Sequence, residues 1–297
     1  MKRDRGAHAG APSVARHRSA ERSPSFTPSF QALGALAYAG AKVSVAAVDL
    51  QSGQSIFAVD ERIVLPTSSV GKILLLIEVS ARLTDRSLSD FAIVDRQPAD
   101  AVAFSGLWQH LQAPALPVVD LAALVGATGD NLATNALLRH VGLSAVRSRT
   151  ESLGLVRTAL LDTARDSRGP DDAPQLSVGS TAELAWLFYA LAHGHIIDEA
   201  TSQRVLSWLS LNTDLSMVAS AFGRDPLVHR GVDHNTWMVN KTGSESGVRC
   251  EAGVLRGPRG GLAYAVSVQF EDRDLAARLR VMDALRTLGL DLLEHVH

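Results

Sequence analysis

The chain of 297 residues lacks several features that would point to particular classes of protein. Cys250 is its only cysteine, so an intrachain disulfide and a Cys-based metal cluster are both excluded, and a reducing compartment fits. No apolar run approaches the roughly 20 residues needed to span a bilayer. An excess of positive charge is also missing. The net charge of −2 argues against general affinity for nucleic acid or for an acidic membrane surface.

Residues 1–29 lack any aliphatic cluster and are rich in Arg, Ser, Ala and Pro, which predicts a disordered basic tail. The segment has no apolar core of about 7–15 residues, so it does not resemble a Sec signal peptide. We therefore expect a cytoplasmic protein, or a secreted one if translation starts at a different codon. We interpret the basic charge of the tail as solvated, in preference to a nucleic-acid or membrane contact.

The rest of the chain has an ordinary globular composition, and its patterns predict strands at both ends with helices between them. The predicted strands are 42–50 and 55–59, joined as a hairpin, and then 236–243, 248–255 and 262–270. The predicted helices are 30–39, the apolar run after Ser69, 107–112, 118–129, 131–141, 143–154, 181–194, 199–212 and 274–296.

This order of elements predicts an α/β (α+β) fold: one antiparallel sheet flanked by helices, with an inserted all-helical lobe. The domain spans 30–296. Its α/β lobe takes about 30–68 and 213–296, and its helical lobe takes about 69–212. A cleft between the two lobes is the natural place for a site.

A lysine stands at the start of the most apolar run of the chain, LPTSSVGKILLLIEV (65–79). The run predicts a helix buried on every side, where an ammonium must be paired, neutralised or functional. Ser69 lies three residues before Lys72 and would share its helix face. A lysine in a dry site beside other cations can lose its proton near neutral pH and activate a serine. On its own, the pair is better explained by a helix cap and a lysine that reaches solvent.

Two further stretches favour a catalytic role for Ser69 and Lys72 over the structural explanation. TGDNLATNALL (128–138) places Asp130 and Asn131 before an apolar helix, and VNKTGSESGVR (239–249) ends a strand with Lys-Thr-Gly. With SSVGK they match, in order and rough spacing, the motifs S-x-x-K, S-D-N and K-T-G. The sequence therefore resembles the class A β-lactamases and their D,D-peptidase relatives over roughly residues 30–296.

The resemblance implies a β-lactamase/transpeptidase-like fold and a role for each matched residue. Ser69 would be the nucleophile that forms an acyl-enzyme, and Lys72 would be its base or part of the proton relay. Asn131 would hold Lys72 and a substrate amide. Lys241 and Thr242 would bind the substrate carboxylate.

The same resemblance assigns the oxyanion hole to the backbone N–H groups of Ser69 and Ser244, donors worth roughly 3 kcal/mol each to acyl transfer. Gly243 would let the substrate lie against the strand, because a side chain there would obstruct it. Arg249 stands near the place where many relatives carry a carboxylate-binding arginine. A solvated strand charge explains Arg249 nearly as well.

Gly129 departs from the pattern, because the family has a serine before the Asp-Asn pair. That hydroxyl passes a proton to the leaving nitrogen, and such general-acid catalysis is often worth about 10²–10⁴ in rate. Water or Thr128 could replace it. An ester substrate would suffer less from the loss, because an alkoxide leaving group needs protonation less urgently.

A second departure lies in residues 160–184, where the family has an Ω-loop glutamate that activates water for deacylation. No Glu precedes Glu183 here, and Glu183 fits a capping box with Ser180 at the start of the next helix. Among the loop aspartates, Asp166 is the candidate deacylation acid. The alternative is a plain surface loop with scattered carboxylates. Without a base the acyl-enzyme should persist.

We therefore expect a serine hydrolase of β-lactamase-like type that hydrolyses a β-lactam ring, slowly, and so a part in β-lactam breakdown and antibiotic resistance. The alternatives are an esterase or transacylase on a related substrate, or a binder of β-lactam or peptidoglycan-like ligands without turnover. No metal or organic cofactor is implied. The expected partner is a small-molecule substrate, with no nucleic acid and no membrane, and the oligomeric state is not predicted.

Overall fold

The computed structural model describes residues 25–227, 232 and 234–297, so most of the predicted basic tail lies outside the described residues. The helix predicted for 30–39 is present as α1 (Thr27–Tyr38). It begins three residues inside the segment assigned to the tail, so that boundary is wrong. Pro28 lies in the first turn of α1, where its missing N–H costs no hydrogen bond.

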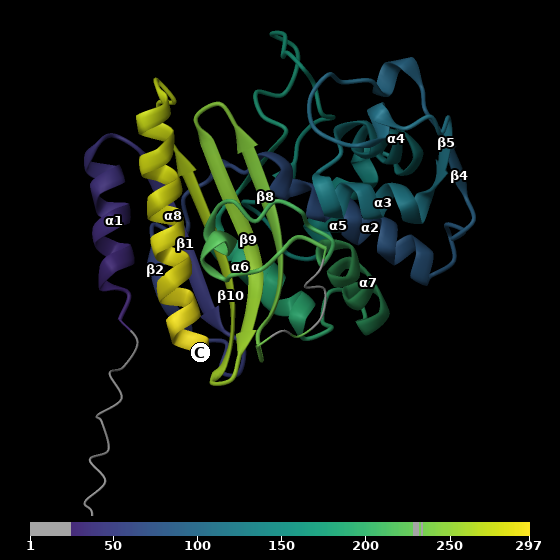
Figure 1. Cartoon of the computed structure of the whole chain (residues 1–297). Coiled ribbons are helices and arrows are strands. Elements are labelled where there is room, and N and C mark those ends of the chain that lie inside the picture. The colour runs from purple at the N-terminus through teal and green to yellow at the C-terminus, as the bar shows by residue number, and fades with distance from the viewer. Residues whose placement is uncertain (1–24, 228–231, 233) are drawn as a thin grey trace, which may run out of the picture.

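One five-stranded antiparallel sheet forms the centre of the fold, in the order β2-β1-β10-β9-β8 (Figure 1). Its strands are β1 (Lys42–Asp49), β2 (Ser55–Val59), β8 (Trp237–Glu245), β9 (Val248–Gly257) and β10 (Gly260–Gln269). Each of the five overlaps a run predicted as a strand, although β8 and β9 end two residues later and β10 begins two residues earlier than predicted. The sheet joins both ends of the chain as expected. β2 and β8 are the two edge strands, and β8 is the one that adjoins the helical elements (Figure 1).

The two faces of the sheet are covered by different helices. α1 and α8 (Leu275–Val296) lie on one face, and α6 (Thr181–Ala192) lies on the other (Figure 1). Side chains of β10 alternate between the two faces. Tyr264 and Val266 pack in the core beneath α1 and α8, and Ala263 and Ala265 pack in the core on the α6 side. Because α6 packs on the sheet, its assignment to the helical lobe is wrong.

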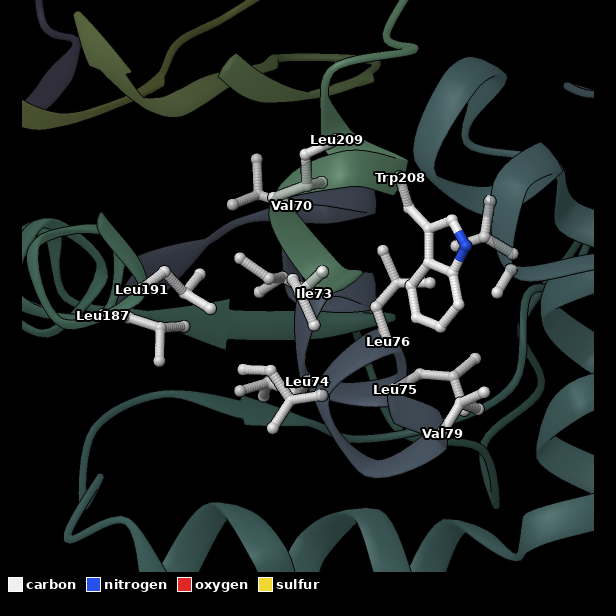
Figure 2. Close-up of a cluster of buried hydrophobic side chains, with 14 of the residues drawn as sticks. Val70, Ile73, Leu74, Leu75, Leu76, Val79, Leu187, Leu191, Trp208 and Leu209 are labelled. Atoms are coloured by element: carbon white, nitrogen blue, oxygen red, sulfur yellow. The ribbon is translucent and has the colours of Figure 1, made fainter. Parts of the chain in front are cut away.

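α2 (Lys72–Thr84) is the central helix of the other lobe and is buried on nearly every side. The helices around it are α3 (Val118–Thr128), α4 (Asn131–Val141), α5 (Leu143–Ser152) and α7 (Glu199–Leu209). Figure 2 shows its apolar side chains between Leu187 and Leu191 of α6 and Trp208 and Leu209 at the end of α7. The prediction of an all-round buried helix is confirmed.

The helix predicted for 107–112 is wrong, because the chain there forms only a single 3₁₀ turn, η3 (Trp108–His110). Tertiary contacts outweigh the local pattern. The Trp108 side chain is fully buried, and its indole N–H donates to the Ala113 carbonyl at 3.0 Å. The backbone N–H groups of Leu107 and Trp108 donate to the Asp130 carboxylate at 2.7 and 2.8 Å.

Five short strands have no counterpart in the prediction, because two or three residues carry no readable period. They are β3 (Leu65–Pro66), β4 (Ile93–Asp95), β5 (Ala115–Pro117), β6 (Ala159–Leu160) and β7 (Ser177–Gly179). The capping box predicted at residue 180 is half formed. Ser180 Oγ accepts from the Glu183 N–H, but the Glu183 carboxylate accepts from the N–H groups of Val156 and Arg157.

Within the part of the chain that the structure describes, no helix combines the length and the apolarity needed to cross a membrane.

Candidate active site

Ser69 lies in a short 3₁₀ turn, η1 (Ser68–Gly71), that leads directly into α2. β7 holds this turn in place: Ser177 Oγ donates to the Ser68 carbonyl at 2.6 Å and lies 2.7 Å from Thr67 Oγ1. Ser68 has a φ of 47°, which is uncommon for a residue with a side chain. No side chain caps the start of η1 or of α2, so the helix-cap explanation of the serines is wrong.

Lys72 is fully buried, so the lysine does not reach solvent. Its Nζ donates to the Gly129 carbonyl at 2.6 Å and to Asn131 Oδ1 at 2.5 Å. Burial and, next, the positive charge of Lys241 lower the pKa of Lys72 to about 7, against the opposing effect of Asp130. A substantial fraction of Lys72 is therefore a neutral amine at pH 7, and a neutral amine can accept a proton.

Gly129, Ser69 and Lys241 meet at one point, although they come from α3, η1 and β8. A Cβ added at Gly129 would lie 3.6 Å from Ser69 Oγ and 3.3 Å from Lys241 Nζ. Gly129 ends α3 with a φ of 64°, the left-handed conformation that favours glycine at this position. The residue that departs from the family pattern is therefore in the centre of the site.

Lys241 is also buried, and its Nζ donates to the Thr242 carbonyl at 2.9 Å. Burial lowers the pKa of Lys241 to about 8, so it is mostly charged at pH 7. The Thr128 hydroxyl, a candidate replacement for the missing serine, donates to the Leu124 carbonyl within α3 at 3.0 Å. Its proton is directed into the helix and away from the site.

Asp130 and Asn131 connect this site to the loop before α3. Asp130 is fully buried and caps α4 by accepting from the Ala133 N–H at 2.9 Å, in addition to its bonds to the loop. Asp130 therefore has a structural role, which is to hold the start of α4 against the loop that precedes α3. Asn131 was expected to hold Lys72 and a substrate amide. It contacts Lys72, but its Nδ2 donates to the Phe104 carbonyl at 2.7 Å.

Gly243 is needed for the packing of the protein itself, and its predicted role in making room for the substrate stays a prediction. A Cβ added there would lie 2.3 Å from the Thr67 carbonyl oxygen and 3.0 Å from the Ser69 nitrogen. The obstruction is therefore with the nucleophile turn of the protein itself. The missing side chain brings the Ser69 backbone N–H against β8, one residue before Ser244. Thr242 is buried and Ser244 is exposed on this strand.

Arg249 is only 9% exposed, so its explanation as a solvated strand charge is wrong. Its guanidinium donates to the carbonyls of Glu245 and Val248 at 2.8 and 2.7 Å, and lies 6.0 Å from the centre of the Phe270 ring. It binds the β8–β9 turn. Its role in carboxylate binding stays a prediction.

Asp166 is exposed, and both of its carboxylate oxygens lie 2.9 Å from the Ala103 N–H. The residue that the loop presents to α4 is instead Ala164. Its N–H and C=O bind the Asn135 side chain at 2.8 and 2.9 Å. Asn135 was missed in the sequence, although it lies four residues after Asn131 and so on the same face of α4.

No group of three or more His, Cys, Asp or Glu side chains among the described residues is placed to hold a metal ion. The site instead joins a partly accessible serine, an amine that is neutral in a substantial fraction of molecules at pH 7, and a buried cation. These are the parts that nucleophilic acyl transfer requires.

Comparison with protein families matches residues 26–296 to the model described as the beta-lactamase enzyme family. No curated protein matches the sequence. The chain is similar to the solved β-lactamase from Sphaerobacter thermophilus, at 24% identity and a TM-score of 0.77, over 90% of this chain and 96% of that one. It is also similar to a mutant of the class A β-lactamase of the last common ancestor of Gram-negative bacteria, at 23% identity and a TM-score of 0.75, over 91% of this chain and 100% of that one.

A third similar structure is that of PBP-A, at 18% identity and a TM-score of 0.74, over 89% of this chain and 93% of that one. A mutant of PBP-A, at 18% identity and a TM-score of 0.71, over 88% of this chain and 94% of that one, was solved as an acyl-enzyme complex with penicillin G. At these identities the structural likeness establishes the fold, which agrees with the α/β class predicted from the sequence.

Proposed function

Because the chain belongs to the beta-lactamase enzyme family, a family of class A-like serine hydrolases, we propose that Ser69 opens a β-lactam ring and forms an acyl-enzyme that is released slowly. One observation carries the proposal. Ser69 Oγ and Lys241 Nζ both approach the same point beside Gly129, and the Gly129 carbonyl in turn holds Lys72.

Lys72 supplies the base. Its neutral amine takes the proton of Ser69 as the Oγ–C bond forms at the lactam carbonyl, and Asn131 keeps the amine in place. The backbone N–H groups of Ser69 and Ser244 receive the negative charge that develops on the carbonyl oxygen. The C–N bond of the lactam then breaks, and its nitrogen requires a proton.

Lys241 is our candidate for the donor of that proton. In this chain no hydroxyl stands at Gly129, and the Lys241 ammonium lies 3.3 Å from the position of a Cβ there. A pKa of about 8 makes this ammonium a stronger acid than an ordinary lysine, while it still holds its proton at pH 7. Lys241 then has two roles, as the cation for the substrate carboxylate and as the acid.

The loop contacts support slow release. Ala164 offers only a methyl group at the position fixed by Asn135, and Asp166 is bound to the Ala103 N–H. Neither residue provides a carboxylate that is held ready to activate water. An acyl-enzyme without such a base persists, because the attacking water is not deprotonated.

Intact-mass spectrometry with penicillin G tests the proposal. We expect the wild-type protein to gain the mass of one penicillin G and to keep it long after free penicillin is removed. Ser69→Ala should gain none. A wild-type protein that stays unmodified, or a Ser69→Ala variant that is modified equally, contradicts the proposal. Rapid hydrolysis of a chromogenic cephalosporin would contradict the slow release alone.

A second candidate function is ester hydrolysis, and Gly129 is the observation that favours it. Ester cleavage expels an alkoxide or phenoxide, which needs less help from a general acid than an amine does. A p-nitrophenyl ester, assayed with the wild type and with Ser69→Ala, distinguishes the two. Turnover of the ester that depends on Ser69, with no adduct from penicillin G, would favour the esterase.

A further inference from the structure

We propose that Glu245 forms a subsite for a positively charged group, such as a primary ammonium, on the acyl side of the substrate. The inference rests on the proposed acylation of Ser69 and names the class of acyl group that the same site prefers. Three observations carry it: the position of Glu245 along β8, the lack of a partner for its carboxylate, and the engagement of the neighbouring arginine.

The position follows from the order of residues along β8. In the proposed function Lys241 binds the substrate carboxylate and the Ser244 N–H binds the reacting carbonyl. A substrate that lies along the strand therefore extends its acyl side chain beyond Ser244, towards Glu245, at about 3.3 Å per residue.

The direction follows from the alternation of side chains in a strand. Glu245 shares the face of β8 that carries Lys241 and Gly243. That face meets the nucleophile turn, because a Cβ at Gly243 would lie 3.0 Å from the Ser69 nitrogen. Figure 1 shows β8 at the edge of the sheet that adjoins the helical elements. Glu245 therefore points to the side on which the acyl group is held.

The carboxylate of Glu245 lacks a hydrogen-bond donor among the residues that the structure describes. Its Oε1 is shielded from solvent and accepts no hydrogen bond. Burial accordingly raises the pKa of Glu245, and the positive charge of Arg168 opposes that shift. A buried acceptor without a donor destabilises a folded protein, so its presence requires an explanation.

Arg168 does not provide the missing donor. Its guanidinium donates to Asp162 Oδ2 at 2.7 Å and to the Ala173 carbonyl at 2.8 Å, within its own loop. Those bonds keep Arg168 in the loop and leave Glu245 with a net attraction for a second cation. Glu245 is only partly buried, so an ammonium would reach the carboxylate through its other oxygen, Oε2, and form a charge-assisted hydrogen bond there. A neutral or anionic acyl group would leave the carboxylate unpaired.

Two penicillins that differ by one ammonium group test the proposal. Ampicillin carries this group on the acyl side chain of penicillin G. We expect the ratio of the acylation rate constants, ampicillin over penicillin G, to be about tenfold higher in the wild type than in Glu245→Gln. The penicillin G rate should change by less than about twofold, because that substrate does not use the subsite.

Glu271→Gln is the matched control, because it removes the same charge from an exposed position and should leave the ratio unchanged. Glu245→Ala provides a second variant and should lose the preference as well. An equal ratio in the wild type and in the Glu245 variants would overturn this inference alone. Failure of both penicillins to modify Ser69 would overturn the proposed function, and this inference with it.

Discussion

At the scale of single residues, Gly129 has the largest expected effect on the chemistry. In the proposed mechanism, the absence of a hydroxyl at this position moves the delivery of a proton from a serine to Lys241, whose Nζ lies beside Gly129. The same glycine also allows the left-handed turn that joins α3 to α4. A substitution there therefore changes the chemistry and strains the backbone at the same time.

We expect Gly129→Ser to acylate with penicillin G at least about tenfold faster than the wild type, because the restored hydroxyl acts as a general acid. The rate with a p-nitrophenyl ester should change much less. Stopped-flow acylation rates measure both. Gly129→Ala adds the same Cβ without the hydroxyl, and a gain in that variant as large as in Gly129→Ser would contradict the explanation.

The two lysines predict a bell-shaped dependence of acylation on pH. Lys72 must be neutral, so the rate should rise as the pH increases through about 7. Lys241 must be protonated, so the rate should fall as the pH increases through about 8. Second-order acylation rate constants across this range check the profile. Lys241→Arg keeps the positive charge but cannot release its proton, so it should acylate slowly and should lose the fall in rate near pH 8.

At the scale of elements, the position of the site depends on how the helix ends are fixed. Asp130 is the clearest case, because one buried carboxylate caps α4 and also binds the loop at Leu107 and Trp108. Asp274 gives the simpler comparison, because it caps α8 by accepting from the Ala277 N–H. The two caps therefore differ in how many backbone donors lose their acceptor on mutation.

We expect Asp130→Ala to lower the free energy of unfolding by about 3 kcal/mol, because one cap is lost and two more donors are left unpaired. Asp274→Ala should cost only about 1 kcal/mol. Chemical denaturation measures both values. Acylation of Ser69 should also slow in Asp130→Ala, since Asn131 loses its support. An equal loss of unfolding free energy in the two variants would contradict the proposal that Asp130 links α4 to the loop.

At the scale of the whole molecule, the sequence predicts the sheet and most helices, because their periods are long and their ends carry recognisable signals. Elements fixed by distant contacts are missed. Trp108 sits in a turn and not in a helix, because Asp130 binds that segment from elsewhere in the chain. The packing of α6 on the sheet is likewise invisible in its own pattern.

The sequence predicts the site residues that belong to motifs. It does not predict the residues whose importance depends on three-dimensional contacts. Ser69, Lys72 and Lys241 were recognised from their motifs, as was the importance of Gly129. The close approach of Gly243 to Thr67, the clamp of Asn135 on Ala164 and the unpartnered Glu245 depend on contacts between distant segments. No local pattern in a single sequence reports such contacts.

The pairing of β1 with β10 has a consequence for how this chain folds. Lys42 to Asp49 pair with residues 262–269 along their whole length, so an early strand has its partner near the other end of the chain. During synthesis β1 and β2 can pair only with each other, as a ribbon with both edges open, until the ribosome has released β10. Closing so large a loop is entropically slow, so we expect the sheet to assemble late and to be prone to mispairing until then.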